Sequence, residues 1–187
     1  MDAASEDIVE IGFNEAKLDL ETVFHAQYER IARIIAGVIR DPARAEELAV
    51  EVFLKWERTP NAQGTGTEGW LYRTAVRIAL NELRRKTVQI RYERLLGFVT
   101  AGRSGGSTPH EIYAAQEEHK RVRAVLGAIE PRQAEMLLLR GNDLSYQELA
   151  SALNLNPASV GTLLSRALEA FRKEFVRRYG EERYGHK

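Results

Sequence analysis

Apolar residues recur every three or four positions along most of this 187-residue chain, which is the spacing that places them on one face of a helix. The first such stripe lies between residues 19 and 40 and consists of Phe24, Tyr28, Ile31, Ile35 and Val38. Asp41 and Pro42 follow it, and they suit the N-cap and the first residue of a new helix. The pattern therefore predicts two consecutive helices, the second extending to about Arg58.

A third helix is predicted after a loop. The loop, Thr59–Gly69, contains one proline and three glycines, which disfavour regular structure. From about Glu68 to Glu93 helical spacing returns, with an inner stripe of Trp70, Leu71, Ala75, Ile78, Ala79 and Leu83. The loop lacks the GK[ST] ending of a phosphate-binding loop, and no strand precedes it, so we exclude a nucleotide-binding P-loop.

Residues 96–109 read LGFVTAGRSGGSTP, a composition typical of a flexible linker. Helical spacing resumes after it, and Pro131 opens a further helix that ends near Gly141. The patterns predict an all-α fold of two small helical domains. We expect an acidic N-terminal arm at 1–18, a helical domain at 19–95, a linker at 96–109 and a second helical domain at 110–187.

The C-terminal domain contains two short helical segments with strong start signals. Ser145 and Glu148 form a capping box, and Asn156-Pro157 supplies a second N-cap and first helical residue. Two capped helices joined by a short turn indicate a helix-turn-helix, whose second helix reads DNA in the major groove. The outward side chains that we expect to contact DNA are Ser159, Thr162, Ser165 and Arg166. An ordinary antiparallel helix pair is the alternative.

Charge is distributed unevenly, although the formal net charge is zero. Residues 1–60 carry a net charge of −6, residues 61–119 of +2 and residues 120–187 of +4. Between Trp70 and Arg94 there are seven basic and two acidic side chains. Such a patch suits a phosphate backbone and unstacked bases, although a solvated helix face is the alternative. The candidate DNA-binding residues here are Trp70, Arg73, Arg77, Arg84 and Arg85.

The sequence offers no reaction centre. Cysteine is absent, and the four histidines are scattered without metal-ligand spacing. We therefore predict neither an enzyme nor a site for a metal or cofactor. The chain starts without a signal peptide and contains no apolar run long enough to cross a bilayer, so we expect a cytoplasmic protein.

Three segments, taken in order, resemble a known family. They are DPARAEELAVEVFLKWER, GWLYRTAVRIALNELRRK and LSYQELASALNLNPASVGTLLSRALEAF. The chain resembles bacterial RNA polymerase sigma factors of the extracytoplasmic-function (ECF) group, within the sigma-70 family. These have two helical domains, called regions 2 and 4, joined by a linker. The resemblance covers roughly residues 20–96 and 110–179.

The resemblance implies a transcription initiation factor that binds core RNA polymerase and directs it to specific promoters. Region 2 would melt and read the downstream (−10) element, with a flipped base held by the loop 59–69, and region 4 would read the upstream (−35) element. It also implies promoter DNA and an anti-sigma factor as partners. The residues that would bind the polymerase are Glu47, Leu48, Glu51, Phe53 and Leu54.

The chain departs from the family pattern in each segment. Val50 stands where the family often has glutamine, Ile78 and Asn81 replace polar residues of the promoter-melting helix, and Gly161 stands where a basic residue is usual. Two other functions are compatible with the residues. One is a free-standing helix-turn-helix regulator that binds duplex DNA unaided, and the other is an adaptor whose N-terminal domain binds a different protein.

Overall fold

The structure, a computed structural model, describes residues 19–95 and 110–180. Every regular element in these two ranges is a helix, which confirms the predicted all-α class. The predicted arm at 1–18 and linker at 96–109 lie outside the described residues, as does the C-terminal end, 181–187. None of the helices in the described part combines the length and the hydropathy that crossing a membrane requires.

The N-terminal group consists of α1 (Leu20–Ile39), α2 (Pro42–Glu57), the 3₁₀ turn η1 (Pro60–Ala62) and α3 (Thr67–Leu95). Asp19 and Asp41 cap α1 and α2 by accepting hydrogen bonds from backbone N–H groups. Between these helices Arg40 adopts the left-handed conformation, φ 57°, which turns the chain sharply. The largest side chains buried in this group are Trp56, Tyr72, Phe53, Ile31, Ile34, Ile35, Leu71 and Leu80.

The C-terminal group consists of α4 (His110–Ala128), α5 (Pro131–Gly141), α6 (Tyr146–Leu153) and α7 (Pro157–Tyr179). The helix starts predicted at Pro131, Ser145 and Asn156 are confirmed, because Glu130, Ser145 and Asn156 cap α5, α6 and α7. Its core is formed by Val125, Leu139, Leu144, Leu149, Val160, Ala167 and Phe175.

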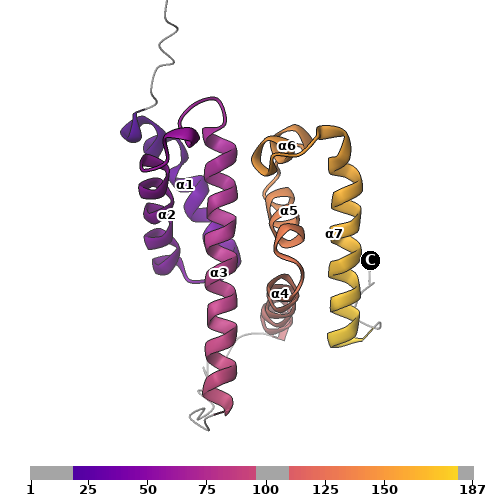
Figure 1. The fold of residues 1–187 in the computed structure, drawn as a ribbon. Coiled ribbons are helices and arrows are strands. Elements are labelled where there is room, and N and C mark those ends of the chain that lie inside the picture. Colours follow the sequence, from indigo (N-terminus) through magenta and orange to yellow (C-terminus); the bar gives the residue numbers. More distant parts are fainter. Residues whose placement is uncertain (1–18, 96–109, 181–187) are drawn as a thin grey trace, which may run out of the picture.

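Helix α3 is the member of the N-terminal group that faces the C-terminal group along most of the molecule (Figure 1). It packs against α1 and α2 on one side and against α4, α5 and α6 on the other. At its N-terminal end the approach is close, since a Cβ atom added to Gly69 would lie 3.1 Å from the Cα of Ala152 in α6. Glycine at position 69 therefore lets the backbones of α3 and α6 approach each other.

The end of α7 carries a compact ion cluster that makes stability depend on pH. Hydrogen bonds from Arg177 and Arg178 lower the pKa of Glu174 to about 2. A carboxyl group with a lowered folded-state pKa stabilises the protein above its unfolded pKa, about 4.5, and the contribution is lost as the pH falls towards 2. Glu174→Gln should therefore cost about 1 kcal/mol at pH 7, a modest value because Arg177 is exposed and solvent screens the pair. Urea unfolding at pH 7 and pH 2.5 checks this, and an equal loss at both pH values would contradict it.

Candidate nucleic-acid interface

The helix-turn-helix is built as the sequence predicts. The Ser145 Oγ accepts a hydrogen bond from the Glu148 N–H at 3.2 Å, and the Glu148 carboxylate accepts one from the Ser145 N–H at 2.7 Å. These bonds also lower the pKa of Glu148. The turn uses Asn154 in the left-handed conformation, φ 52°, and the Asn156 side chain accepts from the Ala158 N–H at 2.9 Å to start α7. Both helices are thus fixed by satisfied caps.

The exposed side of α7 presents the four predicted reading residues to solvent. Ser159, Thr162, Ser165 and Arg166 are all exposed. The Ser165 hydroxyl donates to the Gly161 carbonyl at 3.0 Å, so its oxygen remains available as an acceptor. Arg166 supplies the positive charge of this face, and arginine can pair with guanine through two hydrogen bonds.

Tyr146, in α6, is a residue of this surface that the sequence analysis did not single out. Its side chain is 47% exposed, and its ring lies 3.7 Å from where a Cβ atom of Gly161 would stand. The Arg140 guanidinium lies 5.8 Å from the ring centroid. The sequence signal for this residue is its place directly after Ser145, the N-cap of the first helix of the helix-turn-helix. Tyr146 therefore lies beside Gly161, the position at which the family often has a basic residue.

The basic face of α3 is directed at the C-terminal helices over much of its length. The Arg77 Nε donates to the Glu135 carboxylate of α5 at 2.7 Å, and the Arg73 Nε lies 3.9 Å from the other oxygen of that carboxylate. The Arg84 Nε donates to the Gly127 carbonyl of α4 at 3.2 Å. Burial lowers the pKa of Arg73, and the neighbouring charge of Arg77 lowers it further. Trp70 is partly buried at the start of the same helix.

The fifth predicted residue, Arg85, belongs to a different cluster on α3. It is largely exposed and pairs with Glu82, 3.0 Å away, which is itself buried. The Arg44 Nε of α2 lies 3.5 Å from the same Glu82 oxygen. Burial alone would raise the pKa of Glu82, but the hydrogen bonds and charges of Arg85 and Arg44 outweigh it and lower the pKa. This cluster ties α3 to α2 and leaves Arg85 at the solvent.

The buried side chain of Trp56 fixes the loop before α3 by a hydrogen bond. The Trp56 indole N–H donates to the Ala62 carbonyl at 3.0 Å, and the Thr67 hydroxyl donates to the same oxygen at 2.8 Å. The Gly64 N–H donates to the Thr67 hydroxyl at 3.1 Å. The loop thus includes the short η1 turn, and α3 begins at Thr67, so the segment is more ordered than its composition indicates.

The structure divides the five predicted polymerase-binding residues into two sets. Leu48 and Phe53 are only 3% and 2% exposed, so α2 does not present them to solvent, and their contact with a polymerase stays a prediction. Phe53 faces away because its ring packs on Phe24 and Tyr28 of α1. Among the exposed residues of α2, Glu47, Val50, Glu51 and Leu54 follow one another at helical spacing and form a stripe.

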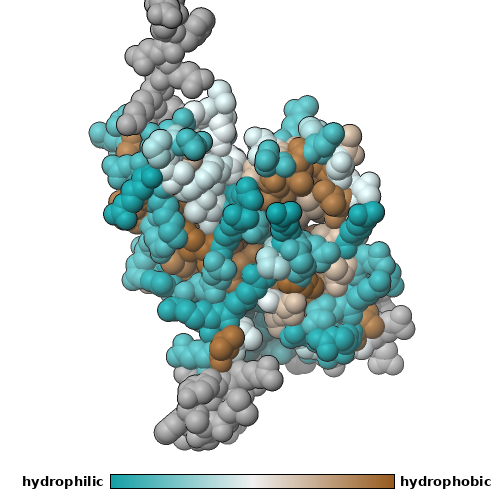
Figure 2. Space-filling view, viewed as in Figure 1, coloured by the Kyte–Doolittle hydropathy of each residue, from teal (hydrophilic) through white to brown (hydrophobic). Residues whose placement is uncertain are grey.

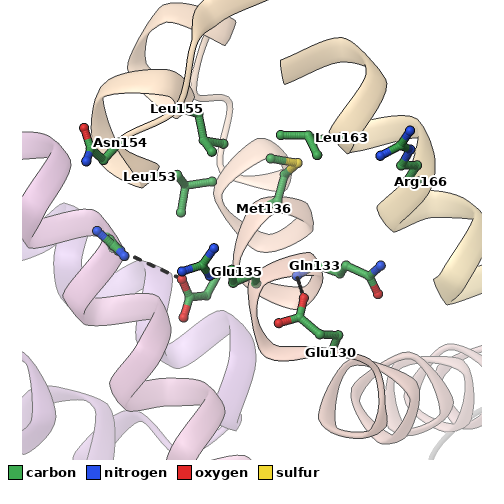
Figure 3. Close-up of a pocket in the computed structure, with 11 residues that line it drawn as sticks. Glu130, Gln133, Glu135, Met136, Leu153, Asn154, Leu155, Leu163 and Arg166 are labelled. Carbon is green, nitrogen blue, oxygen red and sulfur yellow. Dashed lines mark hydrogen bonds and ion pairs between the residues drawn. The ribbon is translucent and has the colours of Figure 1, made fainter. Parts of the chain in front are cut away.

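A cavity of about 460 Å³ lies where α3, α5, the α6–α7 turn and α7 meet. Arg73 and Arg166 both line it, together with an apolar wall of Met136, Leu153, Leu155 and Leu163 (Figure 3). Figure 2 shows hydrophobic side chains gathered at the level of α6 and the upper half of α7, while hydrophilic side chains cover most of the remaining face. Among the described residues, no three His, Asp or Glu side chains are placed to hold a metal ion.

The capped helix-turn-helix and the arginine-rich α3 are the features of a helical DNA-binding protein. Known proteins that are similar in sequence narrow this class to one family. Residues 23–88 match the family Sigma-70 region 2, and residues 119–171 match Sigma-70, region 4. The chain is also similar to the ECF RNA polymerase sigma factor SigK of Mycolicibacterium vanbaalenii, with 26% identity over 150 residues, 77% of this chain and 75% of the relative. The chain belongs to the sigma-70 family, in its extracytoplasmic-function group, and is a promoter-directing transcription initiation factor.

Proposed function

We propose that this chain binds core RNA polymerase through α2, opens and reads the downstream promoter element through α3 and its preceding loop, and reads the upstream element through α7. The observation that carries the proposal is the pairing of a fully capped helix-turn-helix with a separate arginine-rich helix, each within a region matched to the family. A free-standing regulator needs only the first of these features.

The proposed polymerase contact is the α2 stripe of Glu47, Val50, Glu51 and Leu54. Val50 and Leu54 are each 42% exposed, although both are apolar. Exposed apolar side chains flanked by charged ones are typical of a protein interface, where the apolar residues form the buried centre. The two glutamates also interact along their own helix, Glu47 with Arg44 at 2.6 Å and Glu51 with Lys55 at 2.7 Å.

The proposed melting element consists of α3 and the loop anchored by Trp56. In this proposal Arg73, Arg77, Arg84 and Arg85 contact phosphates, and Trp70 stacks with a base. Extruding a base costs a few kcal/mol, and a loop with a fixed backbone can offset that cost by holding the base. The bonds from Trp56 and Thr67 to the Ala62 carbonyl support such a fixed loop.

The test is run-off transcription with purified core RNA polymerase on the DNA upstream of this protein's own gene. We expect a discrete transcript that requires both proteins. If no transcript forms and the chain does not co-elute with core polymerase, but the chain alone shifts that DNA, the protein is a free-standing regulator.

Arg166→Ala separates reading of DNA from binding of polymerase. We expect the loss of one arginine–base contact to lower transcription from the cognate promoter by the equivalent of about 1–3 kcal/mol while polymerase binding is unchanged. Arg33→Ala, which removes an exposed arginine from α1, is the matched control. Equal loss of transcription and polymerase binding in Arg166→Ala would contradict separate roles for α2 and α7.

Three further aspects of the proposal follow from this function. The polymerase carries out the chemistry, so the chain itself is not an enzyme. It acts in the cytoplasm, where the polymerase and the promoter are. An anti-sigma factor is a proposed partner, and purification of the protein from its host under non-denaturing conditions tests whether one remains bound.

A further inference from the structure

The cavity between α3, α5 and α7 combines an apolar wall with a positively charged end. Its volume, about 460 Å³, is within the range of pockets that hold small molecules. The wall consists of Met136 in α5, Leu153 in α6, Leu155 in the α6–α7 turn and Leu163 in α7. Figure 3 shows the Met136 side chain directed towards Leu163. A ligand with apolar surface would gain free energy by displacing water from this wall.

The end of the cavity beside α3 carries an excess of positive charge. Arg73 and Arg132 line this end, and Arg77 lies next to them, with its Nε 2.7 Å from the Glu135 carboxylate. Glu135 is the buried carboxylate that these three guanidinium groups share. The second carboxylate of the lining, Glu130, is already used as the N-cap of α5. An anion at this end would therefore be attracted by uncompensated positive charge.

The same end contains a buried hydrogen-bond donor without an acceptor. The Arg73 Nε has no hydrogen-bond partner, because the nearest Glu135 oxygen is 3.9 Å away. Burial lowers the pKa of Arg73, and the charges of Arg77 and Arg132 lower it further. Arg132 forms no hydrogen bond or ion pair with any residue that the structure describes. An anionic oxygen beside Arg73 and Arg132 would supply an acceptor to both.

From these observations we infer that the cavity binds a small amphipathic acid, with its carboxylate beside Arg73 and Arg132 and its apolar chain or ring along the leucine-rich wall. A guanidinium group can hold a carboxylate through two charge-assisted hydrogen bonds. A free phosphate would satisfy the arginines but leave the wall unused, and a neutral apolar molecule would leave the charge uncompensated. The inference is independent of the proposed function, because it involves neither the polymerase nor the promoter.

The first test uses a methionine as a reporter inside the cavity. The chain contains two methionines, Met1 and Met136, and Met136 is 5% exposed in the cavity wall. The full chain is labelled with ¹³C at the methionine methyl groups and titrated with hexanoate. The Met136 methyl resonance should shift and reach saturation, whereas the Met1 resonance should stay in place as the internal reference. Met136→Leu assigns the two resonances.

The second test compares ligands by isothermal titration calorimetry. Across acetate, butanoate, hexanoate and octanoate, each added methylene should tighten binding by about two- to fourfold until the wall is covered. Hexanoate should bind on the order of tenfold more tightly than 1-hexanol, which has the same chain without the charge. Inorganic phosphate, which has the charge without the chain, should bind more weakly than hexanoate.

Arg132→Gln tests the charged end of the cavity. Arg132 is exposed, so the substitution should leave the helices intact, which far-ultraviolet circular dichroism checks. Hexanoate should bind this variant about fivefold more weakly, because one of the two guanidinium groups is lost, while the affinity for 1-hexanol should not change. Arg33→Gln makes the same chemical change at an exposed position of α1 and should leave both affinities unchanged.

The outcomes decide the inference without reference to transcription. A saturable shift of Met136 alone, together with weaker hexanoate binding by Arg132→Gln, supports the site. An unchanged Met136 resonance overturns it, and so do equal shifts of both methionines, which would indicate nonspecific association. If inorganic phosphate binds as tightly as hexanoate, the cavity is a simple anion site and the amphipathic ligand is excluded. The run-off transcript in the absence of any added acid tests the proposed function separately.

Discussion

Replacing Val50 and Leu54 together by aspartate is expected to weaken the binding of core RNA polymerase about 100-fold or more. Each apolar side chain that moves from water into an interface contributes roughly 1.5–3 kcal/mol, and a buried carboxylate adds a desolvation cost. Both side chains are already 42% exposed, so the substitutions should leave the free energy of unfolding within about 0.5 kcal/mol of the natural value. Polymerase binding is measured by fluorescence titration of the labelled chain.

The matched control for this experiment is Val88→Asp. Val88 lies on α3 and is 67% exposed, so it gives the same chemical change outside the α2 stripe. It should leave polymerase affinity unchanged. Equal weakening by the control, or unchanged affinity of the double variant, would remove α2 as the docking surface.

The second large effect is expected for Trp56→Ala, which should lower the free energy of unfolding by about 3–5 kcal/mol. Trp56 is 1% exposed and belongs to the core between α1, α2 and α3. Its removal leaves a large cavity and also takes away the hydrogen bond to the Ala62 carbonyl. Urea unfolding followed by circular dichroism checks the magnitude.

Trp56→Phe distinguishes the core role of this residue from its role under the loop. The ring still fills most of the space, but the N–H that holds Ala62 is lost, and we expect a cost of about 1–2 kcal/mol. Promoter opening, measured by permanganate reactivity of unpaired thymines, should fall more than polymerase binding. Unchanged opening in Trp56→Phe would show that the loop does not depend on this bond.

Helix positions were predictable because they depend on local signals. Asp41, Ser145 and Asn156 satisfy N–H groups within three residues of themselves, so a short stretch of sequence contains the whole interaction. The exposure of the residues that we propose to read DNA on α7 was predictable for the same reason. Once Val160, Leu164 and Ala167 are buried, the spacing of 3.6 residues per turn leaves the opposite side to solvent.

The parts that sequence reasoning missed depend on partners far along the chain. The spacing of α2 leaves Phe53 near the edge of its apolar face, and only Phe24 and Tyr28 of α1 decide that it is buried. Val50 was treated as a departure from the family, yet it lies in the exposed stripe. Glu135 is an isolated glutamate in sequence, and nothing local indicates that Arg77 is its partner.

The surface that α3 turns to the C-terminal helices combines glycine, arginine and one facing glutamate with apolar side chains. Gly69 gives a close fit to Ala152, and Leu83 lies near Gly127. Arg77 and Arg84 add charge to the same contact, because they donate hydrogen bonds to Glu135 and to the Gly127 carbonyl. Charged groups therefore interrupt the apolar area of this contact, and an interrupted patch promotes aggregation less than a large continuous one.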